Sequence, residues 1–166
     1  MKLSRADFAW SLASLTIMAL SLGLSFAHVM EAPPRLAEWP PELWRETTVF
    51  HGQYAMFGIL GGPIDVGSIL LGFIVVYLIG RHDRPAFPLA LAGSILFLVS
   101  LAVWLSVVAP ANARMAGWLP GPLPEGFASV QLRWETGHMV MAGLKLAGFL
   151  LMVAAILVMR REPRLR

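Results

Sequence analysis

Long apolar runs alternate with shorter polar segments along this chain. Four runs are predominantly apolar, at about residues 8–30, 52–80, 88–108 and 135–159. A helix rises 1.5 Å per residue and the hydrocarbon core of a bilayer is about 30 Å thick, so roughly 20 apolar residues span it. Each run reaches that length. The pattern therefore predicts an all-α integral membrane four-helix bundle.

Proline and glycine punctuate these runs. Pro33 and Pro34 lie in the first of two long loops, 31–51 and 109–134, and are expected to end the first helix. Residues 61–65, Gly-Gly-Pro-Ile-Asp, interrupt the second run. We expect one transmembrane domain over residues 1–166.

The first run has a second interpretation, as a cleaved signal peptide. Lys2 and Arg5 precede it, and residues 25–27 (Ser-Phe-Ala) resemble a cleavage site. Its apolar stretch is longer than the roughly 7–15 residues of such a segment, so we expect it to be retained as a helix.

The distribution of basic residues predicts the orientation, because cytoplasmic segments are enriched in Lys and Arg. Of the 13 basic residues, eight lie at the two ends of the chain and in the short loop after the second helix, whereas the two long loops hold four. The eight are Lys2, Arg5, Arg81, Arg84, Arg160, Arg161, Arg164 and Arg166, and the four are Arg35, Arg45, Arg114 and Arg133. Both termini are therefore expected in the cytoplasm, with the long loops outside.

Composition narrows the class further. Hydrophobic residues make up 57% of the chain and charged residues 14%, against about 25% charged residues in a soluble domain. The chain has no cysteine, which excludes disulfides, zinc–thiolate sites and iron–sulfur clusters. Because the basic residues follow the orientation pattern, the net charge of +3 does not indicate nucleic acid. The expected surroundings are the lipid bilayer of the inner (plasma) membrane.

Polar residues of the kinds used in catalysis and ligand binding lie at the outer ends of the predicted helices. They are His28, Glu31, His51, Asn112, Trp134, Glu135 and His138. His28 and Glu31 are three residues apart, as are Glu135 and His138, so each pair is adjacent on a helix. This spacing suggests either a shared pocket or a simpler arrangement, in which Glu135 caps a helix N-terminus and the histidines lie at the headgroup boundary.

The same residues raise the question of a metal centre. A Glu-x-x-His pair that faces into a four-helix bundle is one way to hold a di-metal site, and imidazole with carboxylate suits iron, zinc or copper. His28, His51 and His138 are the candidate ligands. We predict no cofactor, and keep one haem or one metal ion as the alternative.

Two ionisable residues fall near the middle of predicted helices. Asp65 lies in the second helix, and Lys145 lies seven residues after His138, about 10 Å deeper at 1.5 Å per residue. Because a charge that faces lipid is costly, both are expected to point into the bundle, where they form an ion pair or contribute to a proton relay or ligand contact.

Three short motifs carry a family resemblance that spans nearly the whole chain. They are FAHVMEAP at 26–33, PAN at 110–112 and RWExxH at 133–138. Their order resembles the anthrone oxygenase-like family, small four-helix membrane proteins mostly of unknown function. The resemblance implies oxidation of anthrones to anthraquinones without bound flavin or haem, with His28, Asn112, Trp134 and His138 as the functional positions. This chain has Gly137 and Met141 where that family often has tryptophan and arginine.

Three hypotheses about function follow. In the first, His28 or His138 removes a proton from a lipophilic aromatic, Asn112 binds an oxygen, and Glu31 and Glu135 orient the imidazoles. In the second, the histidines bind haem or a metal. In the third, the chain is a non-catalytic accessory subunit, and its partner is a second copy or another protein of a membrane complex.

Overall fold

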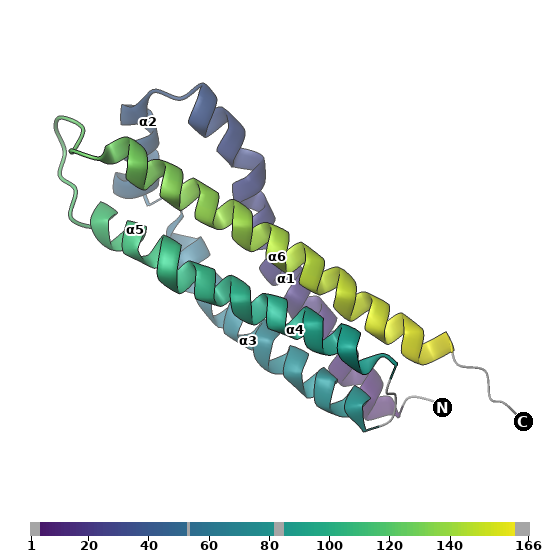
Figure 1. The fold of residues 1–166 in the computed structure, drawn as a ribbon. Helices are drawn as coiled ribbons and strands as arrows, with labels where there is room; N and C mark the ends of the chain where they lie inside the picture. Colours follow the sequence, from purple (N-terminus) through teal and green to yellow (C-terminus); the bar gives the residue numbers. More distant parts are fainter. Residues whose placement is uncertain (1–3, 53, 82–84, 162–166) are drawn as a thin grey trace, which may run out of the picture.

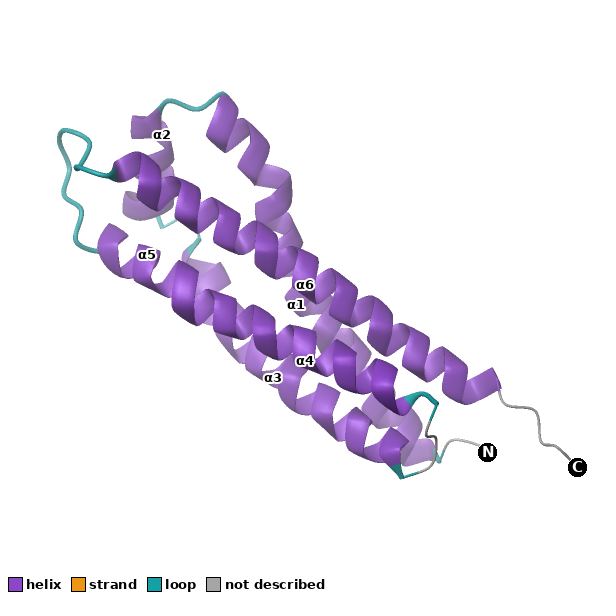
Figure 2. Cartoon of the chain, in the orientation of Figure 1, coloured by secondary structure: helices purple, strands orange, loops and turns teal. Residues whose placement is uncertain are grey.

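Every regular element in the part of the chain that the structure describes is a helix. The computed structural model describes residues 4–52, 54–81 and 85–161. Its long helices are α1 (Arg5–Ala37), α3 (Ala55–Gly80), α4 (Phe87–Val103) and α6 (Phe127–Arg161), and they pack as a four-helix bundle (Figures 1 and 2). The prediction of an all-α bundle is confirmed for these residues.

Four helical segments are long and apolar enough to cross a membrane. They are α1, α3, the continuous stretch Phe87–Met115, and α6 as far as Met159. Only 28–39% of the most apolar window of each segment is buried inside the bundle, so most of each span faces outward. Outward-facing apolar helices indicate a multi-pass membrane protein, since a helix satisfies its own backbone hydrogen bonds in lipid.

The two ends of the bundle differ in their connections. α1 begins, α3 ends and α6 ends at one end, whereas the opposite end carries the shorter helical segments and the longer loops (Figure 1). We call this second end the outer end. Of the basic residues that predict the orientation, Lys2, Arg84, Arg164 and Arg166 lie outside the described residues.

Prolines do not end or interrupt the helices as the sequence predicts. α1 continues through Pro33 and Pro34 to Ala37, because its last turn is held by a bond from the Glu38 amide to the Pro34 carbonyl (2.9 Å) and by the buried Arg35 side chain. α3 runs unbroken through Pro63. Proline removes only one amide donor there, and in apolar surroundings no water competes for the remaining backbone hydrogen bonds.

The predicted outer loops are partly helical. The first contains α2 (Pro41–Arg45) and the π-helical turn η1 (Glu46–Phe50). In the second, α4 continues through a π-helical turn η2 (Trp104–Val108) into α5 (Ala109–Met115), and α6 already begins at Phe127. The spans predicted to end at residue 108 and to begin at residue 135 are therefore too short.

Pro110 explains the π-helical turn η2. In an α-helix, its ring would clash with the carbonyl of Ser106, and its missing amide would leave that carbonyl unpaired. The wider turn separates the two groups. The Ser106 carbonyl instead accepts a hydrogen bond from Arg133 Nη2 of α6 at 2.8 Å. Proline here creates a link between two helices.

Small residues let α4 and α6 approach closely in the inner half of the bundle. A Cβ atom added to Gly93 would lie 2.8 Å from the Gly148 carbonyl oxygen, and one added to Gly148 would lie 2.8 Å from that of Gly93. Such close approach of glycine backbones is a common basis of helix packing in membranes. Beside this crossing lies an apolar core in which Met18, Phe97 and Met152 are at most 2% exposed.

This close crossing makes Gly148 intolerant of a side chain. Gly148→Val should destabilise the protein by about 1–3 kcal/mol, the usual cost of overpacking, and lower its melting temperature in detergent. Gly143→Val is the matched control, because an added Cβ at this exposed position of α6 meets no atom within 4 Å. Equal melting temperatures of the two variants would contradict the packing described.

Candidate functional site

The outer half of the bundle encloses a cavity of about 590 Å³. Segments from α1, η1, α3, α4, η2, α5 and α6 contribute to its walls. Six residues singled out in the sequence line it: His28, Asp65, Asn112, Trp134, His138 and Lys145. The other three candidates, Glu31, His51 and Glu135, are not among its lining residues.

A stacked pair of imidazoles forms part of the cavity wall. The rings of His28 on α1 and His138 on α6 are 4.0 Å apart between centroids and inclined by 15°. The Trp134 indole packs edge-on against His138 at 4.5 Å, since residues four apart share a helix face. The Nδ1 atom of His28 has no hydrogen-bond partner among the described residues, although the side chain is only 4% exposed.

Aromatic side chains surround this imidazole pair. The rings of Tyr54 and Phe57 lie 5.0 Å and 4.9 Å from His28. Trp134 Nε1 donates a hydrogen bond to Asn112 Oδ1 at 2.8 Å, which fixes the indole and ties α5 to α6. The wall is therefore rigid and aromatic, and the imidazoles of His28 and His138 supply nitrogen atoms within it.

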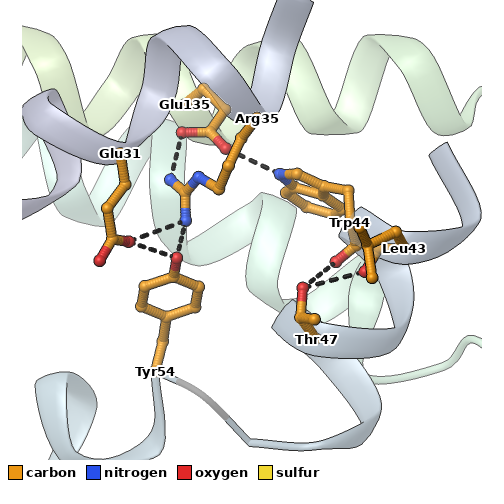
Figure 3. Close-up of polar contacts among 7 residues, drawn as sticks. All are labelled: Glu31, Arg35, Leu43, Trp44, Thr47, Tyr54 and Glu135. Atoms are coloured by element: carbon orange, nitrogen blue, oxygen red, sulfur yellow. Dashed lines mark hydrogen bonds and ion pairs between the residues drawn. The ribbon is translucent and has the colours of Figure 1, made fainter. Parts of the chain in front are cut away.

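A buried polar network covers the outer side of this wall (Figure 3). Arg35 Nη2 lies 2.6 Å from Glu135 Oε2, and Trp44 Nε1 donates to Glu135 Oε1 at 2.7 Å. Tyr54 donates to Glu31 Oε2 at 2.5 Å, and its hydroxyl also accepts from Arg35. Arg35, Trp44 and Glu135 are at most 1% exposed.

This network corrects the roles expected for the two glutamates. Both oxygens of Glu135 are taken by Arg35 and Trp44, and Glu31 contacts Arg35 and Tyr54, so in the described structure these carboxylates bind the network instead of the imidazoles. The partners on α1 and α2 draw Glu135 toward Arg35 and Trp44, although its position on the helix is adjacent to that of His138. Glu135 does not cap α6 either, since that helix begins at Phe127.

Asp65 and Lys145 meet at the inner end of the cavity. Lys145 Nζ lies 2.7 Å and 2.9 Å from the two carboxylate oxygens of Asp65 and donates to Ser25 Oγ at 2.8 Å. Ser21 donates to the same carboxylate at 2.6 Å. Both charges are therefore paired, and hydroxyl groups of α1 complete their hydrogen bonding.

The three candidate metal ligands do not come together. His51 is exposed and its Nδ1 lies 2.8 Å from the Glu46 carbonyl oxygen. The imidazole rings of His28 and His138 are stacked and nearly parallel. A metal ion lies in the plane of each imidazole that binds it. The planes of these two rings do not meet near the rings, so in this arrangement the pair does not bind one ion together. Among the described residues, no group of three or more His, Cys, Asp or Glu side chains is arranged to hold a metal ion.

Several residues of the site are not identified by the sequence reasoning. Arg35 and Trp44 look like loop residues because prolines precede them, and Tyr54 and Phe57 look like ordinary apolar positions. One signal was present: Arg35 is four residues from Glu31, the spacing of an ion pair on a helix that continues past the prolines.

The fold and cavity define a class of protein, a helical bundle of membrane-spanning type with a mainly apolar, aromatic cavity near one end that holds a few polar groups. In comparisons with known proteins, no family model, no curated protein and no solved structure matches this chain. The geometry of the cavity therefore carries the functional assignment.

The Asp65–Lys145 pair should show strong coupling. Replacing one partner, by Lys145→Met or Asp65→Asn, leaves the other buried and unpaired, which typically costs about 3–5 kcal/mol. The double variant should be more stable than the less stable single variant. Melting temperatures in detergent measure this difference, and equal values for the three variants would contradict the coupling.

Proposed function

We propose that this protein binds a flat, lipophilic, oxidisable aromatic molecule in the cavity and oxidises it with molecular oxygen, with His138 as the general base. One observation carries the proposal. His28, Asn112, Trp134 and His138 come from three separate helices, and all four line a single cavity. These are the positions for which the resemblance to the anthrone oxygenase-like family implies a function.

The size and walls of the cavity suit such a molecule. Its volume of about 590 Å³ falls within the roughly 300–1,000 Å³ of small-molecule sites. Trp134, Tyr54 and Phe57 offer faces and edges on which a flat ring packs. The polar groups available to it are few, as expected for a site that orients a mostly apolar ligand.

The proposed reaction is the conversion of a ring methylene, which is conjugated with a ketone across the same ring through the fused aromatic rings, into a second ketone. His138 removes one proton from the methylene, and the electron pair moves toward the ketone oxygen, to which the Asn112 amide donates. The carbon then adds O₂, and the proton returns to the peroxide. Loss of the second methylene proton expels hydroxide, and together they leave as water. One O₂ is consumed for each ketone and water formed.

His28 positions the base in this scheme. Its ring stacks on the His138 imidazole, and the Trp134 indole packs edge-on against the same imidazole. These two contacts hold His138 without a carboxylate partner. Such fixed placement allows an imidazole to meet the reacting C–H bond without reorganisation.

We also propose that the protein lies in the inner (plasma) membrane with both termini in the cytoplasm. The support is the excess of Lys and Arg at the ends of the chain and in the short loop after α3. The described beginning of α1 and end of α6 share one end of the bundle (Figure 1). The cavity would then face the outer leaflet.

Reporter fusions test this orientation. A reporter active only outside the cytoplasm should give no signal when fused after Arg166, and should give a signal when inserted in the loop between α5 and α6, at Pro120. Activity of the C-terminal fusion would reverse the orientation.

Substitution of the proposed base tests the reaction. Anthrone is the substrate, and oxygen uptake by the protein in lipid nanodiscs is the measurement. His138→Ala should lower kcat by about 10²–10⁴-fold, the usual contribution of a general base, while anthrone still binds. His51→Ala is the matched control, because this histidine is exposed and outside the cavity. Unchanged turnover by His138→Ala removes His138 from the mechanism, and wild-type protein that neither binds nor oxidises anthrone overturns the proposed function.

A further inference from the structure

We infer that the ligand enters the cavity sideways from the bilayer, through an opening between α3 and the α4–η2 segment, and that glycines of α3 keep this opening wide enough for a polycyclic molecule. The inference rests on the proposed function, and deepens it by specifying the route and the size of the ligand.

The wall that α3 contributes is made largely of glycine. Gly58, Gly61 and Gly62 all line the cavity, on the same helix face as Asp65. A Cβ atom added to any of the three would meet no atom within 4 Å. These glycines therefore differ from Gly93 and Gly148, whose missing side chains permit helix contact. Here the missing side chains leave empty space that belongs to the cavity.

Side chains cover the inner end of the cavity and much of its outer end, where Gly52 and Ala55 line it and are exposed. On the outer side, Trp44 packs against Trp134 at 5.7 Å and is fully buried, and Arg45 donates to the carbonyls of Gly121 and Pro122, which holds the loop before α6 in place. On the inner side lie the Asp65–Lys145 pair and the apolar core below it.

The lateral route is open. Gly58, Gly62 and Val66 line the cavity and are also exposed on the surface of the bundle, and Leu101 and Trp104 line the cavity from the other side of the gap. These positions of α3 lie 3 to 11 residues from its start at Ala55, about 5–17 Å along the helix. An opening at that depth meets lipid in a membrane-spanning bundle.

The surface around the opening is suited to lipid. Ile59 is 63% exposed and Leu105 is 59% exposed, and they lie on the two helices that flank the gap. Polar molecules from water would have to cross this apolar surface, whereas a molecule already dissolved in the bilayer would not. The occupant is therefore a lipophilic one.

A second observation points to a ligand with a polar group. The imidazole of His138 lines the same cavity and is only partly buried, and the neighbouring His28 has an Nδ1 atom without a partner in the described structure. A polar group of a ligand in the cavity hydrogen-bonds the His138 imidazole. A lipid acyl chain has no such group. The expected occupant is a flat aromatic molecule with a polar substituent, not an acyl chain.

Side chains added at the glycines test this inference through binding, without turnover. The probes are anthrone, with three fused rings, and 1-tetralone, with two, added under argon to the full-length protein in nanodiscs. Quenching of tryptophan fluorescence reports occupancy, because Trp104 and Trp134 line the cavity. Gly61→Leu should weaken anthrone binding at least tenfold and 1-tetralone binding less than threefold. Gly62→Leu, at the opening, should slow association and dissociation of anthrone together.

Gly143→Leu provides the matched control, since Gly143 is exposed on α6 outside the cavity, and it should bind both ketones as the wild type does. Retained 1-tetralone binding shows that a variant is folded. Wild-type affinities and rates for anthrone in Gly61→Leu and Gly62→Leu would overturn the inference while leaving the proposed function intact. Displacement of anthrone by lipid acyl chains at equal affinity would also overturn it, and wild-type protein that binds neither ketone overturns the proposed function and this inference together.

Discussion

The ion pair between Arg35 and Glu135 is the contact on which the outer half of this protein depends. It joins the last turn of α1 to α6 at 2.6 Å, with both side chains at most 1% exposed. His28 is seven residues, or two turns, before Arg35, and His138 is three residues after Glu135. Fixing the relative rotation of the two helices at the ion pair therefore also fixes the two imidazoles face to face. Tyr54 and Trp44 share the same charged groups, so the network also places the segments that close the cavity.

Much of the fold could be predicted from the sequence because lipid leaves few alternatives. Four apolar runs of sufficient length predict four helices, and the cost of a charge in lipid predicts that Asp65 and Lys145 face inward, which is where they lie. The partners of Glu31 and Glu135 could not be predicted, because they depend on how far α1 continues and on which helix lies opposite. Pro33 and Pro34 suggest an early end, and only the buried contacts of Arg35 override that local signal.

Gly137 and Met141 are the two residues at which this chain departs from the pattern of the anthrone oxygenase-like family that it resembles, and the structure shows what surrounds each of them. A Cβ atom at Gly137 would lie 2.7 Å from Val108, so a tryptophan there would require α6 and η2 to move apart. Met141 lines the cavity with an apolar side chain where that family often has arginine. Gly137 thus lets α6 lie close to η2, and Met141 makes the cavity wall less cationic than the family pattern implies.

The π-helical turn η2 lets the third membrane span hold one extra residue without losing its phase. A π-helical turn carries one residue more than the α-helical turn it replaces, and both close about one full turn of the chain. Loss of a single residue between Trp104 and Val108 would therefore leave α5 in nearly the same rotation, and Asn112 would keep the side from which it binds Trp134. The room around Pro110 would be lost instead, because its ring would again meet the carbonyl four residues before it, and Arg133 would lose the carbonyl that it now binds.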